Sequence, residues 1–437
     1  MAAIQQKFLF TYKEIENLED LKRLSMLLKY LPDEKLMQTL ETRRGKGRDD
    51  YPIRAMWNSI LAGIVYQHPS IESLRRELGR NGELRDMCGF DPGRDPAVPT
   101  SNAYSNFLKL LIDHQAGIDA IFYDLVDKLS ALIKGFGNTL AIDSKAINSK
   151  AKKPKGNAGD NRGEKDADKG VKRYKGKRPD GSLWESVKSW FGFKLHLIVD
   201  ADTELPVDYQ VTKASCSDVA VGRQMIGEIS KNKPELLKNA DILLGDKGYD
   251  DTELCKILWN QNSVKPVIDK RNKWQLKDEL RALPAKKYLL YNEAGTIHCQ
   301  CKRTGEIRPM QFAGFEKDRD TLKYRCPAKY QNVDCASGSC CCVGDNVRID
   351  IHQDIRRFSP IPRESAKFTD IYKKRSSVER VNSRVDGSFC FDKHFIRGLA
   401  KMKTRCGLAM IAMLGMAYGR VREKQDKYIR SLVKPAA

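Results

Sequence analysis

The chain has 437 residues, enough for a sizeable buried core divided over two or three domains rather than one compact unit. Its 78 Lys and Arg residues outnumber 57 Asp and Glu residues, and the formal charge of +21 favours a polyanionic partner over an acidic small molecule. Nucleic acid is the first candidate. A basic membrane-surface protein is the alternative, but neither an amphipathic basic helix with an aromatic face nor a lipidation signal is evident.

The first twenty residues lack the basic segment and apolar run of a secretion signal, so we expect a cytoplasmic protein, associated with the bacterial nucleoid if DNA is its partner. The most apolar stretch, residues 407–418, is too short to span a bilayer and is interpreted as a buried helix, so no membrane contact is expected. In a reducing compartment the twelve cysteines would stay free of disulfides, and their clustering suggests a metal.

Apolar residues recur at helical spacing over 18–40 and again over 51–66, where Pro52 stands near the helix start. Residues 68–90 then predict two short helices around a polar turn, in the manner of a helix-turn-helix. We expect an N-terminal helical domain over 1–135. It either holds a DNA end or only packs the rest of the chain.

A second domain is expected to begin with NTLAIDSKAI at 138–147, an apolar strand that ends at an acid. Residues 150–177 contain many Lys, Gly, Asp and Arg residues and almost no apolar ones, so they predict a mobile basic loop. This loop is either a solvated insertion or a flap that becomes ordered on DNA phosphates.

The following segments predict the rest of a mixed sheet. Residues 190–200 and 207–215 form a hairpin, 217–230 a helix, 239–251 a strand that ends at a second acid, and 264–269 a fifth strand. This order is what a ribonuclease H-like α/β fold requires, a mixed sheet flanked by helices. We expect this domain to comprise residues 136–271 and 359–425, closed by helices over 370–389 and 398–424, with a frayed basic tail after Arg420.

Residues 272–358 interrupt this pattern as a Cys-rich insertion domain with seven of the twelve cysteines. Four of them would suffice for a closed tetrahedral zinc site, and free thiols in a small apolar insert are the alternative. The candidate ligands are Cys299, Cys301, Cys326, Cys335 and Cys340, with Cys341, Cys342 and His298 nearby.

Asp143 and Asp246 each follow an apolar strand and are candidates to hold divalent cations. Two such ions stabilise the attacking and leaving oxygens of phosphodiester cleavage, and Mg²⁺ prefers carboxylate oxygens. Alone, each Asp is equally compatible with an ordinary turn acid. Tyr372, Arg375 and Glu379, at i, i+3 and i+7, lie along one helix face, while Val378, Val381 and Val385 form an apolar stripe. The alternative is an amphipathic surface helix with an Arg–Glu pair.

At this point the chain resembles the DDE transposases of bacterial insertion sequences. LAIDSKAI resembles the strand of the first aspartate, FGFKLHLIVD the strand after it, and LLGDKGYDD the block of the second aspartate. Tyr372, Arg375 and Glu379 match three positions of the family's Tyr-Arg-Glu-Lys signature, and residues 51–78 are similar to its N-terminal domain. One position departs: Asp386 stands where the signature has lysine, so Arg384 or Lys393 would have to supply that DNA contact.

The resemblance implies that Asp143, Asp246 and Glu379 carry two Mg²⁺ or Mn²⁺ ions. Tyr372 and Arg375 would position double-stranded DNA, the terminal repeats and the target, and a homodimer would bridge two ends. Lys247 and Lys145, beside the two aspartates, would add phosphate contacts. His196 and His394, which are near the acids in sequence, are interpreted as packed or surface residues rather than ligands.

Three hypotheses follow. The first is a cut-and-paste transposase, in which water hydrolyses DNA at the element's ends and the freed 3′ hydroxyls attack target DNA. The second is a domesticated enzyme that cleaves without strand transfer. The third is a DNA-binding protein without activity, against which the intact set of three acids argues.

Overall fold

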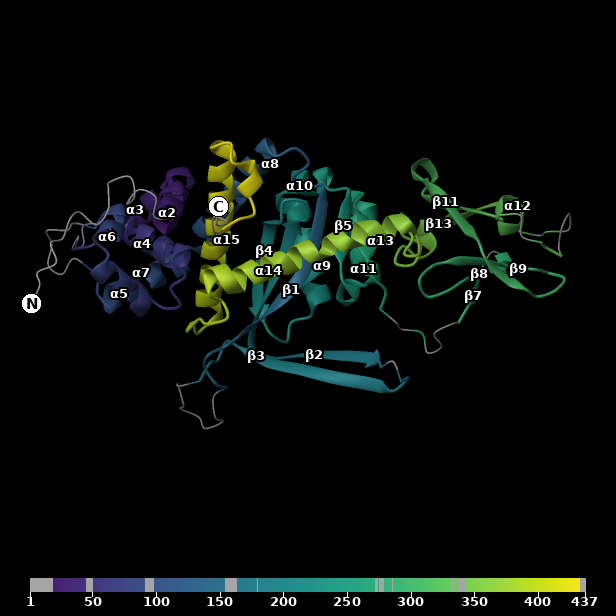
Figure 1. Cartoon of the computed structure of the whole chain (residues 1–437), viewed down its shortest axis with the longest axis horizontal. Coiled ribbons are helices and arrows are strands. Elements are labelled where there is room, and N and C mark those ends of the chain that lie inside the picture. Colours follow the sequence, from purple (N-terminus) through teal and green to yellow (C-terminus); the bar gives the residue numbers. More distant parts are fainter. Residues whose placement is uncertain are drawn as a thin grey trace, which may run out of the picture.

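The computed structural model describes residues 19–44, 50–90, 98–153, 163–178, 180–271, 274, 279–284, 286–331, 334–336, 341 and 343–432. A group of helices lies at one end, a mixed sheet in the middle, and two small sheets at the other end (Figure 1). No helix within these ranges is long and apolar enough to cross a membrane.

The N-terminal region is helical, as predicted. Its helices are α2 (Glu19–Tyr30), α3 (Glu34–Arg44), α4 (Ile53–Val65), α5 (Ile71–Arg80), α6 (Gly82–Cys88), α7 (Ser101–Asp113) and α8 (Gln115–Leu132). The helical spacing over 18–40 corresponds to two helices, α2 and α3, and Pro32 lies at the break between them. Ser70 caps α5 by accepting from the backbone N–H of Ser73, and Asn81 caps α6 in the same way.

The central sheet is mixed, as predicted. Its strands are β1 (Thr139–Asn148), β2 (Asp168–Lys177), β3 (Leu183–Asp200), β4 (Leu205–Lys213), β5 (Ile242–Gly245) and β6 (Lys265–Ile268). Their order is β2-β3-β1-β5-β6, and β4 also pairs with β3. β3 runs antiparallel to β1 and β4, whereas β1, β5 and β6 are parallel to one another. Strand β5 is buried along its whole length, as expected of a strand covered on both faces.

Helices cover this sheet. They are α9 (Asp218–Asn232), α10 (Pro234–Asn239), α11 (Thr252–Lys256), α13 (Ala366–Tyr372), α14 (Ser376–Phe389) and α15 (Leu399–Arg422). α9 contacts β1, β3 and β4, whereas α14 crosses β1 and β3 (Figure 1). α15 packs against α2, α4, α7, α8 and β4, so this buried helix joins the N-terminal helices to the sheet.

Two of our expectations for the C-terminal part are wrong. The helix predicted over 370–389 is divided, because the 3₁₀ turn η6 (Lys373–Arg375) separates α13 from α14. The tail after Arg420 does not fray within the described residues. Arg420 donates to the carbonyl of Tyr428, Arg23 donates to the carbonyl of Leu432 at 2.6 Å, and the Leu432 side chain is buried.

The basic loop expected over 150–177 is also wrong in its second half. Residues 154–162 lie outside the described residues, but 168–177 form β2, which pairs with an unexpectedly long β3. Two tryptophans of β3 explain why residues 168–177 form a strand. Trp190 lies opposite Gly170 and Trp184 opposite Gly176, and a Cβ at either glycine would come within 2.4 Å of the indole. Because the two glycines have no side chain, the indole rings can lie against β2. They supply apolar contacts that the residues of β2 themselves do not provide.

Residues 281–350 form the two small sheets. The first contains β7 (Arg281–Leu283), β8 (Lys286–Tyr291), β9 (Ile297–Gln300) and β10 (Ile307–Pro309). The second contains β11 (Gln311–Glu316), β12 (Thr321–Arg325) and β13 (Asn346–Asp350), with the short helix α12 (Pro327–Gln331) after β12. Both sheets lie between β6 and α13 in the chain.

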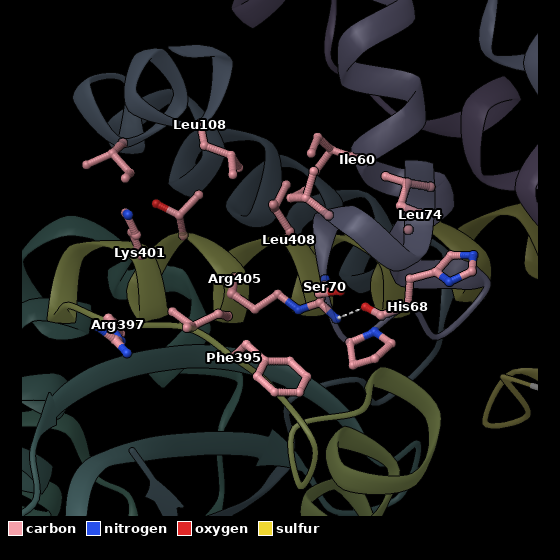
Figure 2. A pocket seen from close by; sticks show the side chains of 16 residues that line it. Ile60, His68, Ser70, Leu74, Leu108, Phe395, Arg397, Lys401, Arg405 and Leu408 are labelled. Atoms are coloured by element: carbon pink, nitrogen blue, oxygen red, sulfur yellow. Dashed lines mark hydrogen bonds between the residues drawn. The ribbon is translucent and has the colours of Figure 1, made fainter. Parts of the chain in front are cut away.

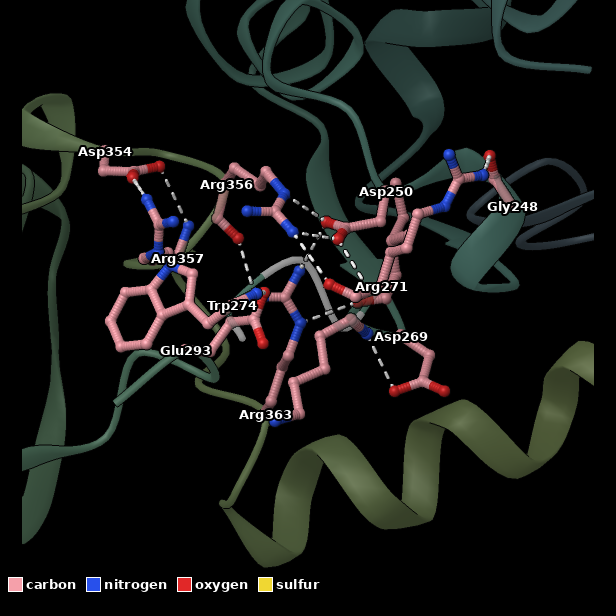
Figure 3. Close-up of polar contacts among 12 residues, drawn as sticks. Gly248, Asp250, Asp269, Arg271, Trp274, Glu293, Asp354, Arg356, Arg357 and Arg363 are labelled. Atoms are coloured by element: carbon pink, nitrogen blue, oxygen red, sulfur yellow. Dashed lines mark hydrogen bonds and ion pairs between the residues drawn. The ribbon is translucent and has the colours of Figure 1, made fainter. Parts of the chain in front are cut away.

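A buried ion cluster ties the segments before and after the two small sheets to the central sheet (Figure 3). Asp250, which follows β5, is fully buried and pairs with Arg356 and Arg363, which come after the two small sheets in the chain. Its carboxylate also accepts from the backbone N–H of Arg271, which comes before the insertion, at 2.7 Å. Arg363 further donates to the carbonyl of Ile268 at 2.9 Å.

Removing Asp250 should destabilise the fold strongly. Asp250→Ala leaves two arginines without their shared carboxylate, so we expect a loss of about 3–5 kcal/mol in the free energy of unfolding. The matched control is Asp241→Asn, which removes the partly exposed pair with Lys265 and should cost less than about 1 kcal/mol. Urea denaturation followed by tryptophan fluorescence measures both. Equal losses in the two variants would show that the cluster does not stabilise the fold.

Candidate functional site

Asp143 and Asp246 are neighbours across two parallel strands. Ile142 of β1 pairs with Gly245 of β5, and the two aspartates are the next residues of their strands. Asp246 caps the 3₁₀ turn η1 (Lys247–Tyr249), where its Oδ1 accepts from the N–H of Gly248 at 2.7 Å. A Cβ at residue 248 would lie 2.7 Å from the same oxygen, so the glycine is needed for this close approach. The structure thus brings the first two predicted acids together.

The surroundings of Asp143 disfavour its negative charge. Burial, with a smaller contribution from the nearby Asp246 carboxylate, raises the pKa of Asp143 to about 6. The Ser144 backbone N–H, Lys172 and Arg375 act in the opposite direction but do not cancel the effect of burial. The two aspartates are therefore adjacent, half-buried carboxylates, and their surroundings favour the neutral form of Asp143.

Glu379 approaches from α14. Val378, Val381 and Val385 are fully buried and pack this helix on the sheet, as the predicted apolar stripe requires. The Glu379 side chain is 52% exposed and pairs with Arg375 at 2.9 Å. One turn further along, Asn382 donates to Asp143 Oδ2 at 3.4 Å. The helix edge that carries Glu379 thus faces Asp143.

Sequence reasoning missed Asn382. The available signal was its position three residues after Glu379, which places both side chains on one side of the helix. The amide oxygen of Asn382, Oδ1, is buried and has no hydrogen-bond partner. An unpaired buried oxygen beside a carboxylate leaves room in the site for a further donor or a cation.

Tyr372 and Arg375 lie together beside the acids. The Arg375 guanidinium is 5.7 Å from the centre of the Tyr372 ring, and η6 contacts both β1 and β5. The charge of Arg375 acts on the pKa of Asp143, which places it near that carboxylate. Although η6 breaks the predicted helix, Tyr372, Arg375 and Glu379 still lie next to one another.

The other predicted DNA contacts differ in their surroundings. Lys145 of β1 forms an ion pair with Asp386, the residue at the position where lysine was expected. Arg384 is largely buried and pairs with Glu204 at 2.5 Å, so its guanidinium faces the protein. Lys247 and Lys393 are exposed.

Both histidines are packed, as interpreted from the sequence. His196 is fully buried within 2.9 Å of Thr212 Oγ1, and burial lowers the pKa of His196 to about 4. His394 is also buried, and burial lowers its pKa. Neither is placed as a proton carrier for the aspartates at neutral pH.

Five cysteines of the insertion line one small cavity of about 20 Å³: Cys299, Cys301, Cys326, Cys335 and Cys341. Cys340 and Cys342 lie outside the described residues. Burial raises the pKa of Cys299 to about 11, and the neighbouring thiols of Cys326 and Cys335 contribute. As placed, no three His, Cys, Asp or Glu side chains in the described ranges form a group that could hold a metal ion, here or at the aspartates.

A separate cavity of about 320 Å³ lies between the N-terminal helices and α15 (Figure 2). Arg405 borders it and donates to the carbonyl of Phe389 at 3.1 Å, and burial lowers the pKa of Arg405 to about 10. None of the three predicted catalytic acids lines this cavity.

The stability of the metal-free chain should depend on Asp143. A carboxyl whose pKa is higher in the folded state stabilises the fold below about pH 4, and this contribution is lost as the pH rises through about 6. Asp143→Asn should therefore raise the free energy of unfolding at pH 8 by about 2–3 kcal/mol and leave it nearly unchanged at pH 4. Urea denaturation in a chelator at the two pH values measures this. A variant less stable than the wild type at pH 8 would contradict it.

The comparisons with known proteins identify the family of the chain. The family model described as "Transposase DDE domain" matches residues 134–414, which include all three acids. No curated protein matches the chain. A cryo-EM structure of the piggyBac transposase synaptic complex with hairpin DNA is similar over 97% of this chain and 80% of that chain, with a TM-score of 0.40 and 11% identity. Since the family model covers more than half of its residues, the chain belongs to the DDE transposases.

Proposed function

We propose that this chain cleaves DNA at the ends of a mobile element and joins the freed 3′ ends to target DNA. The observation that carries this proposal is the register of two parallel strands, which sets Asp143 beside Asp246. α14, which carries Glu379, lies beside this pair, because Asn382 of the same helix donates to Asp143. Three carboxylates from separate elements are the arrangement that phosphodiester chemistry with divalent cations needs.

The sheet supports a ribonuclease H-like assignment for the catalytic domain. Without the added strand β2, the order is β4-β3-β1-β5-β6, with β3 antiparallel to the other four. The first aspartate lies in β1 and the second directly follows β5, and these two strands are parallel neighbours in the sheet. We propose domain boundaries at 136–271 and 359–425, with residues 272–358 as an insertion.

Asp143, Asp246 and Glu379 would hold two Mg²⁺ or Mn²⁺ ions. The donors are all hard oxygens, and a cation bound between them would favour the charged form of Asp143, which burial and the nearby Asp246 carboxylate disfavour. Such ions supply charge stabilisation to the attacking and leaving oxygens. Glu379 would first have to leave Arg375. The guanidinium, then free, is suited to bind the phosphate of the strand to be cut.

The DNA would lie over this edge of the sheet. Arg375 and Tyr372 flank the acids, and exposed Lys247 and Lys393 are available for phosphate contacts. Arg384 and Lys145 are less suited to this role, because each is already paired with an acid. A homodimer that bridges two DNA ends would complete the reaction, since each end needs its own set of acids.

Loss of the acids should abolish both cleavage and strand transfer. We expect Asp246→Asn and Glu379→Gln to lower Mg²⁺-dependent nicking of the DNA that flanks this reading frame at least about a thousandfold, while binding of that DNA persists. Asp370→Asn, which removes an exposed acid of α13, is the matched control and should retain activity.

The outcomes separate the three hypotheses. Nicking without joining would identify a hydrolytic enzyme, and binding without nicking by the wild type would identify an inactive DNA-binding protein. If both acid variants nick as fast as the wild type, the three acids are not the catalytic ones.

We also propose that the cysteine cavity of the insertion holds a structural zinc ion. Thiols from three separate segments line a space of about 20 Å³, and small sheets with few large apolar residues gain stability from such a centre. Four of the candidate ligands would have to move closer together around the metal. This centre would be chemically distinct from the carboxylate site, because sulfur ligands favour zinc and carboxylate oxygens favour Mg²⁺.

The purified full chain should then contain about one zinc per chain, measured by mass spectrometry of the metals. Cys299→Ser and Cys326→Ser should lose the zinc and lower the thermal unfolding temperature. Cys216→Ser, outside the insertion, is the control and should retain both. A wild-type chain produced with added zinc that contains none would refute the assignment.

A further inference from the structure

A two-stranded ribbon projects from the catalytic sheet. β2 pairs with β3 from Asp168↔Gly192 to Lys177↔Leu183, whereas β1 and β4 pair with β3 from Gly192 onward. The first half of β3 therefore pairs with β2 alone among the described strands. Figure 1 shows this ribbon extending away from the body of the protein.

The ribbon exposes apolar side chains to solvent. The exposed fractions are 84% for Leu183, 55% for Val187, 47% for Val171 and 38% for Trp184. These are four of the nine exposed large hydrophobic residues in the described part of the chain. In the register, Leu183, Val187 and Val171 fall on one face and Trp184 on the other. An exposed apolar group of this kind indicates a binding surface.

The same ribbon is strongly basic. Residues 168–190 contain seven Lys and Arg residues and three acids. Each acid already has an interaction within the protein. Asp168 accepts from the N–H of Ser215, Asp180 accepts from Ser182 in the turn, and Glu185 lies 3.8 Å from Arg173. Seven basic and three acidic residues leave this segment with a formal net charge of +4.

The root of the ribbon lies at the catalytic acids. Lys172 of β2 donates to the carbonyl of Ser144, the residue after Asp143, at 3.4 Å. A nucleic acid strand bound at Asp143 would therefore continue onto the ribbon.

We infer that the β2–β3 ribbon is a binding arm for the duplex DNA that enters the active site. Its Lys and Arg side chains contact phosphates, and its exposed apolar side chains contact the groove. A two-stranded ribbon fits the major groove, which is about 12 Å wide. This inference rests on the proposed function. A second copy of the chain is a poorer occupant, because two ribbons with this charge surplus would repel each other.

The test is the salt dependence of DNA binding by the full chain, with Asp246→Asn as the parent so that no DNA is cut. The ribbon variant carries four substitutions: Lys169→Gln, Arg173→Gln, Arg178→Gln and Lys188→Gln. The matched control removes the same charge from exposed positions of the insertion: Lys286→Gln, Lys287→Gln, Lys317→Gln and Arg319→Gln. Fluorescence polarisation of a labelled duplex at several salt concentrations gives affinity and slope.

We expect the ribbon variant to bind at least about tenfold more weakly, with a log–log salt slope shallower by about 3 to 4, because each lost phosphate contact removes about 0.9. The control should change both values much less. If the two variants lose affinity and slope equally, the ribbon is not a DNA arm. If the parent itself binds no DNA, the proposed function fails as well.

A third variant tests whether the ribbon binds a second copy of the chain instead of DNA. Val171→Ser, Val187→Ser and Leu183→Ser together remove the apolar face without changing the charge. Weaker DNA binding by this variant, with sedimentation unchanged in the absence of DNA, supports the arm. Dissociation of a DNA-free dimer with unchanged DNA affinity would overturn the inference and assign the ribbon to a contact between copies.

Discussion

The parallel pairing of β1 with β5 is the constraint on which the rest of the site depends. It fixes Asp143 and Asp246 as neighbours in a half-buried position, where like charges repel. Such a pair costs stability in the metal-free chain, so the surrounding structure must hold it in place. The apolar stripe of α14 does this from one side, and the Asp250 cluster holds the segment after β5 from the other.

The central elements could be predicted from the sequence, because their signals are local. A short apolar strand that ends at an acid is visible at Asp143 and at Asp246, and the spacing of Val378, Val381 and Val385 shows which face of α14 is buried. The helical N-terminal region and the mixed sheet followed from the same periodicities. The family model over 134–414 then confirmed the resemblance, whereas the roles of the individual acids stay proposals.

The features that sequence reasoning missed depend on contacts between distant segments. β2 looks like a disordered basic loop on its own, since its apolar partners Trp184 and Trp190 belong to another strand. The same holds for Asp386. At a position where the family signature has lysine, its carboxylate pairs with Lys145 of β1. Neither contact follows from local spacing.

The ribbon and the insertion are both attached to the sheet close to Asp143 and Asp246. Lys172 joins the ribbon to the strand of Asp143, and Asp250 joins the insertion to the segment that follows Asp246. A displacement of either attachment would therefore move one aspartate relative to the other. Because cleavage needs both carboxylates within reach of the same ions, DNA bound along the ribbon would act directly on the geometry of the site. Binding of the substrate and alignment of the acids would then be coupled.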